Sequence, residues 1–421
     1  MKVLWITNTI FPAPSKALGI PAPVVGGWMY GLANHIATTE NIKLAVATTY
    51  NGNEFKTFEI DGVFYYLLPC RTPWNYSKNL ETFLQKLCAD FKPDVVHIHG
   101  TEYAHGLACM RACPSLNYVV SIQGLVGVIA RYYFAGLSLS ELFKSITFRD
   151  MIRFDTLFQA KNKFIKRGGL EQEYIQRTQH VIGRTNWDYA HTKTINPTVI
   201  YHFCNETLRD GFYTSPKWNT TNKTDYTIFL SQASYPIKGL HQVLKAIALL
   251  KKDFPDIKVR VAGQNITQTT TLMNKIKLSG YGAYIKTLIN QLKLHDQVQF
   301  IGSLTEEQMV TEYLNAHLFI CPSSIENSPN SLGEAQLLGV PVIASYVGGI
   351  PDMVTHNESG LLYRFEEVEM LSEQIRHIFS DPILANYLSE NGIKEATLRH
   401  DKIINTNNTI DMYSKIYEKI I

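Results

Sequence analysis

Residues 227–263 decide the fold, and their sequence is TIFLSQASYPIKGLHQVLKAIALLKKDFPDIKVRVAG. Short apolar segments at 227–231 and 258–263 flank a helical pattern over 239–252. Buried strands of parallel sheets have this uniformly apolar character, and two parallel strands need a crossover connection, usually a helix. The stretch therefore predicts a strand–helix–strand unit of a parallel α/β sheet.

The same alternation extends through the rest of the chain. Downstream, apolar segments with helical patterns between them occur at 298–302, 318–323 and 340–345. Upstream, apolar segments that end in polar or glycine residues occur at 3–6, 44–50, 94–100, 117–124 and 180–185. We therefore predict two doubly wound, Rossmann-like α/β domains that face a central cleft, where the carboxyl ends of the strands would hold ligands.

A turn-rich polar segment, TSPKWNTTNKTD, separates the two series of strands at 214–225. A chain of 421 residues also exceeds what one core usually organises. We predict an N-terminal domain over 1–213, a linker over 214–225 and a C-terminal domain over 226–400. A helical pattern over 401–421 predicts a last helix that packs back on the N-terminal domain.

Composition excludes several classes of protein. Hydrophobic residues make up 45% and charged residues 18%, which is typical of a globular chain rather than a disordered one. A net charge of +3 over so large a surface does not favour a nucleic-acid partner. The six cysteines form no C-x-x-C pair, which disfavours zinc, and no apolar stretch is long enough to span a membrane. We expect a cytoplasmic protein.

The interval 128–170 is rich in aromatic residues, and its cations outnumber its anions. This combination favours an anionic membrane surface or a lipid-diphosphate carrier as partner. It predicts peripheral association with the inner face of the plasma membrane. The alternative is that the aromatic residues pack the first domain and the cations are solvated.

The strongest candidate site is Glu326-Asn-Ser-Pro-Asn-Ser-Leu-Gly-Glu334, a polar loop that leads into a predicted helix. Asn330, Ser331 and Leu332 fall at the helix start, where unpaired amides attract an anion such as a diphosphate. Glu334 can accept hydrogen bonds from a vicinal diol such as ribose, and Glu326 from sugar hydroxyls. The alternative is a capping and solvation pattern.

Three other groups could contribute to the same chemistry. Lys238, in Tyr-Pro-Ile-Lys-Gly, follows a predicted strand and can bind phosphate as a point charge. Gly26 and Gly27 precede a helical pattern and would allow close backbone approach to a ligand. His99 ends a predicted strand and could bond substrate hydroxyls, whereas His97 is expected in the core. The two histidines could also bind metal, but no third ligand is apparent. No carboxylate pair of the D-x-D type is apparent either, so no metal is expected.

The order of several motifs resembles that of retaining glycosyltransferases of family 4, which have the GT-B fold. These motifs are Lys238-Gly239, the Glu326–Glu334 spacing, Gly348-Gly-Ile-Pro-Asp352 and Asn357-Glu-Ser-Gly-Leu-Leu362. The resemblance covers almost the whole chain and is strongest over 226–365. It implies that the C-terminal domain binds a nucleotide-sugar donor and that the N-terminal domain faces the acceptor.

The resemblance also implies a role for individual residues. Glu334 would bind the ribose, and Lys238 would bind the diphosphate together with the amides of the helix start. Glu326 would hold hydroxyls of the donor sugar. The Gly27 amide would meet the diphosphate from the other domain, and Leu304 would lie beside the base.

Two positions depart from the family pattern. Ala233 stands where the family has an arginine, so one phosphate-binding cation is missing, and Arg184 is a candidate to replace it. Gln123 stands where many members have a histidine beside the donor sugar. Glutamine can still donate a hydrogen bond to the sugar, but it cannot act as an acid.

Together these features predict a metal-independent, retaining hexosyltransferase that needs no cofactor. Its donor would be a nucleotide-diphosphate sugar, with uridine preferred, and its acceptor a glycan or a lipid-linked oligosaccharide in surface polysaccharide biosynthesis. Catalysis would rest on Glu326, Lys238 and His99. The alternatives are a nucleotide-sugar 2-epimerase of the same architecture and an inactive glycosyltransferase-like binding partner.

Overall fold

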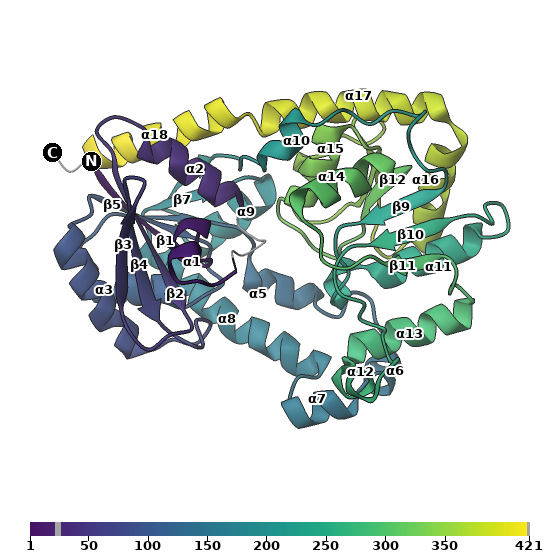
Figure 1. The fold of residues 1–421 in the computed structure, drawn as a ribbon, viewed down its shortest axis with the longest axis horizontal. Coiled ribbons are helices and arrows are strands. Elements are labelled where there is room, and N and C mark those ends of the chain that lie inside the picture. Colours follow the sequence, from purple (N-terminus) through teal and green to yellow (C-terminus); the bar gives the residue numbers. More distant parts are fainter. Residues whose placement is uncertain (22–26, 419–421) are drawn as a thin grey trace. The chain divides into compact units, whose positions relative to one another are not determined.

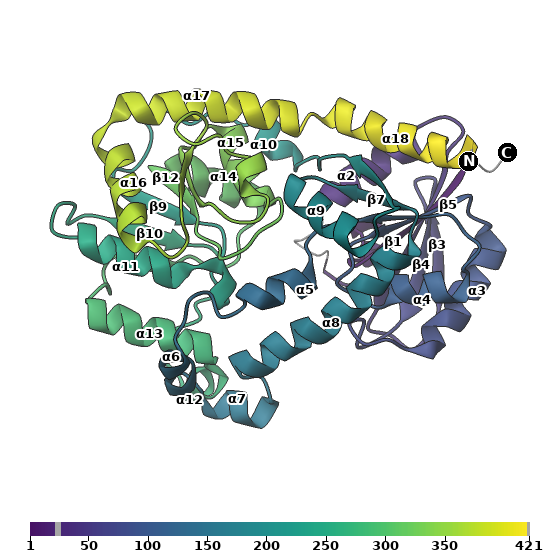
Figure 2. The same cartoon turned by 180° about the vertical axis from the view of Figure 1, so that it is seen from behind.

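A computed structural model describes residues 1–21 and 27–418 of the chain (Figure 1, and from behind Figure 2). It divides into two compact units. Unit 1 comprises Met1–Val128, Ile165–Arg209 and His400–Ile421, and unit 2 comprises Ile129–Phe164 and Asp210–Arg399. Each unit contains one sheet of mainly or wholly parallel strands with helices packed on it, so the predicted α/β class with two Rossmann-like domains is confirmed.

The sheet of unit 1 has the strand order β3-β4-β2-β1-β5-β6-β7-β8, and neighbouring strands are parallel except β3 and β4. Its strands are β1 (Lys2–Thr7), β2 (Lys43–Tyr50), β3 (Lys56–Ile60), β4 (Val63–Pro69), β5 (Val95–His99), β6 (Tyr118–Ser121), β7 (His180–Gly183) and β8 (Ile200–Phe203). The five apolar segments predicted as strands are β1, β2, β5, β6 and β7. Strands β3, β4 and β8 were not predicted; β3 and β8 lie at the sheet edges, where a strand needs no continuous apolar run.

Helices pack against the sheet of unit 1. They are α1 (Pro12–Ala17), α2 (Gly27–Ala37), α3 (Lys78–Phe91), α4 (His105–Ala112), α9 (Asn186–Ile195) and α18 (Lys402–Glu418). The division between the units falls within α5 (Val126–Ile129) and α8 (Leu157–Arg177). Helix α18 belongs to unit 1, where the buried Tyr413 hydroxyl accepts a hydrogen bond from Trp5 Nε1 at 3.0 Å and also contacts His97 Nδ1.

The sheet of unit 2 is wholly parallel, with the order β11-β10-β9-β12-β13-β14. Its strands are β9 (Thr227–Leu230), β10 (Lys258–Val261), β11 (Val298–Phe300), β12 (Leu318–Cys321), β13 (Val342–Ser345) and β14 (Leu361–Tyr363). The chain runs outward from β9 to one edge and from β12 to the other. The boundary between β9 and β12 is therefore the topological switch point, where ligands bind in open α/β sheets.

The helices of unit 2 flank this sheet and extend beyond it. They are α6 (Leu139–Lys144), α7 (Phe148–Arg153), α10 (Asp210–Thr214), α11 (Leu240–Leu250), α12 (Leu272–Lys277), α13 (Gly280–Leu292), α14 (Glu306–Asn315), α15 (Asn330–Leu338), α16 (Val368–Ser380) and α17 (Pro382–Arg399). Short 3₁₀ turns lie at Ala130–Tyr132, Pro236–Lys238 and Ile350–Asp352.

Residues 129–164 belong to unit 2, whereas the sequence assigned all of 1–213 to the N-terminal domain. Hydrogen bonds explain the difference. The His241 Nε2 atom on α11 bonds the Ala135 carbonyl at 2.9 Å, and the Tyr284 hydroxyl on α13 donates to Glu141 at 2.9 Å. These partners are more than 100 residues apart in sequence, so no local pattern could reveal the association.

The segment predicted as a linker, 214–225, packs on unit 2. Its Trp218 side chain is buried, and the indole Nε1 donates to the Ala316 carbonyl at 2.8 Å. The backbone amide of Trp218 donates to the Leu338 carbonyl at 2.7 Å. The residues around Trp218 are polar and turn-forming, so the sequence did not indicate that this side chain is buried.

Candidate functional site

Two charged side chains meet at the switch point of unit 2. Lys238 follows β9 and Glu326 follows β12, and the Lys238 Nζ lies 2.5 Å from Glu326 Oε1. Their side chains are only 13% and 16% exposed. Burial lowers the pKa of Lys238, but the charge and hydrogen bond of Glu326, together with Tyr235, raise it by more, so the net shift of that pKa is upward. The ammonium group is thus fully charged at neutral pH.

A glycine and a backbone hydrogen bond hold the two loops together. Gly239 has a φ of +70°, and a Cβ at this position would lie 1.7 Å from the Pro322 carbonyl oxygen. The Ser324 amide donates to the Ile237 carbonyl at 2.8 Å. Only glycine therefore permits the approach that places Lys238 beside the end of β12.

A second glycine turn supports Glu326 itself. Gly348 has a φ of +54°, and a Cβ there would lie 1.8 Å from the Glu326 carbonyl oxygen. The next amide, that of Gly349, donates to the same oxygen at 3.0 Å. The Ser323 hydroxyl donates to Glu326 Oε1 at 2.8 Å. Backbone and side chain of Glu326 are both held in place.

Helix α15 begins four residues after Glu326, at Asn330, as the sequence predicted. Asn330 and Ser331 form its first turn and are partly exposed. The Leu332 amide, in contrast, donates to the Pro329 carbonyl at 3.0 Å. The prediction of an unpaired amide at Leu332 is therefore wrong, because the proline carbonyl reaches it first.

Glu334 lies on the next part of α15 and is buried. The Tyr313 hydroxyl lies 3.5 Å from Glu334 Oε2 and donates to the Ser331 carbonyl at 2.9 Å. The ring of Tyr313 packs edge-on against Phe229, with 4.9 Å between the centroids. Tyr313 of α14 thus connects the first turn of α15 to Phe229 in the core of unit 2.

Leu304 lies apart from these contacts. It borders an open cavity of about 480 Å³ that Arg260 and Glu312 also line. The Arg260 guanidinium donates to both oxygens of Glu312 at 2.6 Å. The predicted place of Leu304 beside a base stays a prediction.

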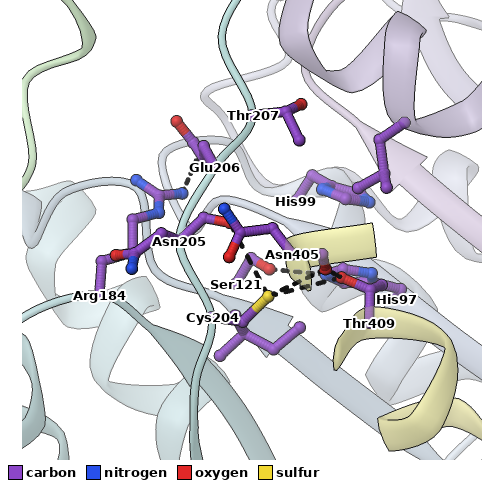
Figure 3. A pocket seen from close by; sticks show the side chains of 12 residues that line it. His97, His99, Ser121, Arg184, Cys204, Asn205, Glu206, Thr207, Asn405 and Thr409 are labelled. Atoms are coloured by element: carbon purple, nitrogen blue, oxygen red, sulfur yellow. Dashed lines mark hydrogen bonds and ion pairs between the residues drawn. The ribbon is translucent and has the colours of Figure 1, made fainter. Parts of the chain in front are cut away.

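In unit 1, His99 and Arg184 line one small cavity (Figure 3). Its volume of about 30 Å³ accommodates water but no sugar. Arg184 forms an ion pair with Glu206, and their side chains are only 4% and 7% exposed. The pair holds both side chains within unit 1, and the predicted role of Arg184 toward phosphate stays a prediction.

The two histidines of β5 are buried and stack with their ring centroids 3.8 Å apart. Burial, together with the charges of His97 and Arg184, lowers the pKa of His99 well below its usual range. His99 is therefore neutral and suited to hydrogen bonding. His97 Nε2 lies 2.6 Å from the Ser121 hydroxyl. Across residues 1–21 and 27–418, no cluster of three His, Cys, Asp or Glu side chains has the arrangement of a metal site.

The other positions singled out in the sequence are Gly26, Gly27, Gln123 and Ala233. Gly27 is the first residue of α2, and Gly26 lies outside the described residues. Gln123 follows β6 and is partly exposed. Ala233, at the position where the family has an arginine, is buried. Roles of Gly27 and Gln123 toward a donor stay predictions.

Three residues of these clusters were missed in the sequence: Glu206, Tyr313 and Ser323. Ser323 ends the apolar segment at 318–323, so its place at a strand end was visible. Glu206 follows β8, an edge strand that the sequence did not predict. Tyr313 lies on a helix whose pairing with α15 depends on the tertiary fold.

The two Rossmann-like units define the GT-B class of glycosyltransferase folds. Residues 214–395, somewhat less than half of the chain, match the family model of the group 1 glycosyl transferases. The match covers the strands of unit 2, with Lys238, Glu326 and Glu334.

Curated relatives match parts of the chain at low sequence identity. An exopolysaccharide phosphotransferase from Streptomyces coelicolor is 30% identical over 192 residues, which are 45% of this chain and 18% of that protein. The chain spans less than half the length of the curated relatives it matches.

Solved structures match nearly the full length of the chain, and two of them serve as examples. A sucrose-phosphate synthase from Thermosynechococcus elongatus has a TM-score of 0.72 at 16% identity and covers 100% of both chains. The Anabaena protein HepE, solved with UDP and glucose, has a TM-score of 0.66 at 14% identity and covers 98% of this chain and 99% of that one. These likenesses support the fold.

Within the part of the chain that the structure describes, no helix is both long and apolar enough to cross a membrane.

Proposed function

We propose that the chain is a retaining glycosyltransferase that takes a sugar from a nucleotide-diphosphate sugar and transfers it to a hydroxyl group. One observation carries the proposal: Lys238 and Glu326 meet at the switch point of the unit that matches the group 1 glycosyl transferases. A phosphate-binding cation and a hydroxyl-binding carboxylate stand side by side there. The complex of HepE with UDP and glucose supports uridine as the base.

The proposed roles follow from the chemistry of each group. Lys238 binds the diphosphate, with help from the first amides of α15 at Asn330 and Ser331. Glu326 accepts hydrogen bonds from donor-sugar hydroxyls, and Glu334 from the ribose. In this proposal Lys238 exchanges its contact with Glu326 for the diphosphate when the donor binds.

Retention requires that the acceptor attacks the face that the leaving group vacates. A bond forms between the sugar C1 and the acceptor oxygen, and the bond from C1 to the phosphate oxygen breaks. The acceptor proton passes to an oxygen of the leaving diphosphate. Lys238 stabilises the negative charge that develops on this group, which is an electrostatic form of transition-state stabilisation. His99 stays neutral and transfers no proton.

The proposed acceptor is a glycan or a lipid-linked oligosaccharide used in surface polysaccharide synthesis. The proposal requires no cofactor and no divalent metal, because positively charged and amide donors hold the diphosphate. It also places the protein in the cytoplasm, in peripheral contact with the plasma membrane.

A thermal-shift screen against nucleoside diphosphates and their sugars tests the donor site, since a ligand that binds the folded state raises the melting temperature. We expect UDP and a UDP-sugar to raise the melting temperature of wild type but not that of Lys238→Ala. NMR of the product then reports the anomeric configuration. Absence of any nucleotide shift, an inverted product, or activity lost in EDTA and restored by Mn²⁺ would each contradict the proposal. Epimerised donor formed without acceptor would favour the 2-epimerase instead.

A further inference from the structure

Two short helices of unit 2 expose large apolar side chains. Helices α6 and α7 lie in the segment 129–164, and Phe143, Phe148 and Ile152 on them are exposed. Phe154, just after α7, is 72% exposed. A folded protein seldom exposes so many large apolar groups within a dozen residues unless they contact a partner.

Helix α12 adds a second group from a distant part of the sequence. Leu272, Met273 and Ile276 are exposed, and Leu272 is 75% exposed. Helices α7 and α12 lie side by side in both views (Figures 1 and 2). The Thr147 hydroxyl, at the start of α7, donates to the Leu278 carbonyl at 2.9 Å. We call these exposed side chains of α6, α7 and α12 the apolar face.

A polar cavity lies beside α12, and Arg149 of α7 also lines it. Its volume is about 490 Å³, and its lining includes Arg149, Asn265, Asn274 and Lys277. Phe148 directly precedes Arg149, and Ile276 directly precedes Lys277. On both helices, an exposed apolar residue thus directly precedes a residue that lines the cavity.

The acidic side chains of the 129–164 segment are engaged within unit 2. Glu141 accepts from Tyr284, Asp150 bonds Arg149 at 2.9 Å, and Asp155 bonds Lys163 at 2.8 Å. Residues 264–280, which contain α12, include no acidic residue. Two of the three carboxylates are thus paired with cations, and Glu141 is held by a hydrogen bond.

Cations on the same helices are exposed and carry no counter-ion. Lys144, Arg153, Lys275 and Lys277 are exposed, and none forms an ion pair with any acidic residue that the structure describes. Basic side chains around an apolar surface are the pattern of helices that lie on anionic bilayers.

We infer that α6, α7 and α12 dock unit 2 on an anionic phospholipid surface, with the cavity beside Lys277 receiving a headgroup phosphate. The apolar side chains would enter the interface between headgroups and acyl chains, and the cations would face the lipid charge. The inference deepens the proposed membrane contact of the transferase, and it extends that contact from residues 128–170 to α12. The surface itself does not depend on catalysis.

Co-sedimentation of the full chain with vesicles tests the inference. We expect binding to phosphatidylcholine vesicles that contain phosphatidylglycerol, and weak binding to phosphatidylcholine alone. The double variant Lys275→Gln with Lys277→Gln should bind the anionic vesicles at least tenfold more weakly, since each cation near an anionic surface contributes about fivefold. The double variant Phe148→Ser with Phe154→Ser should lose binding by a similar factor.

Ile383→Ser and Lys252→Gln serve as matched controls, because both side chains are exposed on unit 2 outside α6, α7 and α12. Both should bind vesicles like wild type. All variants should keep the melting temperature of wild type and its increase on addition of UDP. A defect in the donor site is thereby distinguished from a defect in vesicle binding. Equal binding to neutral and anionic vesicles, or full binding by the double variants, would overturn the inference. The inference would also be overturned if wild type formed a dimer and did not bind vesicles, and if Phe148→Ser with Phe154→Ser dissociated that dimer.

Discussion

The Nζ atom of Lys238 lies 2.5 Å from the Oε1 atom of Glu326, although 88 residues separate them in sequence. The contact exists because β9 and β12 are neighbours at the point where the chain reverses its direction of growth across the sheet. Each side chain neutralises the other while no donor is bound. The proposed donor would separate the pair, with phosphate replacing the carboxylate and sugar hydroxyls replacing the ammonium group.

Replacement of Lys238 by alanine should therefore abolish most transfer activity. We expect kcat/KM to fall by at least about a hundredfold, as for the loss of one donor that stabilises transition-state charge. Steady-state kinetics with a UDP-sugar measures this. Lys252→Ala, an exposed lysine of the same unit, is the control and should be unchanged. If Lys238→Ala had the kcat/KM of wild type, Lys238 would have no role in the mechanism.

Glu334 should distinguish ribose from its deoxy analogues. In the proposed complex its carboxylate accepts hydrogen bonds from the diol, so Glu334→Gln should weaken UDP binding about tenfold. The variant should bind 2′-deoxy-UDP and 3′-deoxy-UDP almost as wild type does. Calorimetric titration with the three nucleotides gives the comparison, and Glu358→Gln, an exposed glutamate, is the matched control. An equal loss for all three nucleotides would instead indicate damage to α15.

The predictable part of this molecule is the part encoded by short patterns. Apolar segments predicted ten of its strands, and the polar loop that leads into a helical pattern predicted the start of α15. Lys238 was placed at a strand end for the same reason. Such features depend on residues close in sequence, so alternation and glycine turns suffice to locate them.

The remainder depends on contacts between distant segments. The assignment of 129–164 to unit 2 depends on His241 and Tyr284, far along the chain. Arg184 was considered as a phosphate-binding residue because of its place after β7. Its partner Glu206 follows the edge strand β8, whose sequence has no continuous apolar run. The ion pair between Arg184 and Glu206 could therefore not be predicted from the sequence.

Arg184 and Glu206 should matter for stability. Breaking a buried pair leaves the other charge uncompensated, so Arg184→Ala should lower the free energy of unfolding by about 3–5 kcal/mol. The double variant Arg184→Met with Glu206→Leu should recover most of this loss, because no unpaired charge remains. Urea unfolding followed by circular dichroism measures both. The double variant should also keep UDP affinity, and a selective loss of that affinity would restore Arg184 as a phosphate ligand.

His241 should make the stability of unit 2 depend on pH. Burial lowers the pKa of His241 to about 4 in the folded chain, against about 6.5 in the unfolded chain. As the pH falls from about 6.5 toward 4, the unfolded chain gains a proton that the folded chain does not. The free energy of unfolding should then decrease, by about 2 kcal/mol at pH 5 for this group alone.

His241→Gln keeps a donor for the Ala135 carbonyl but does not titrate, so the difference in stability between wild type and variant should shrink or reverse between pH 7 and pH 5. Urea unfolding at both values measures this difference, and His295→Gln, an exposed histidine, should give a curve parallel to wild type. A His241→Gln curve parallel to wild type would mean that the buried ring gains its proton without cost.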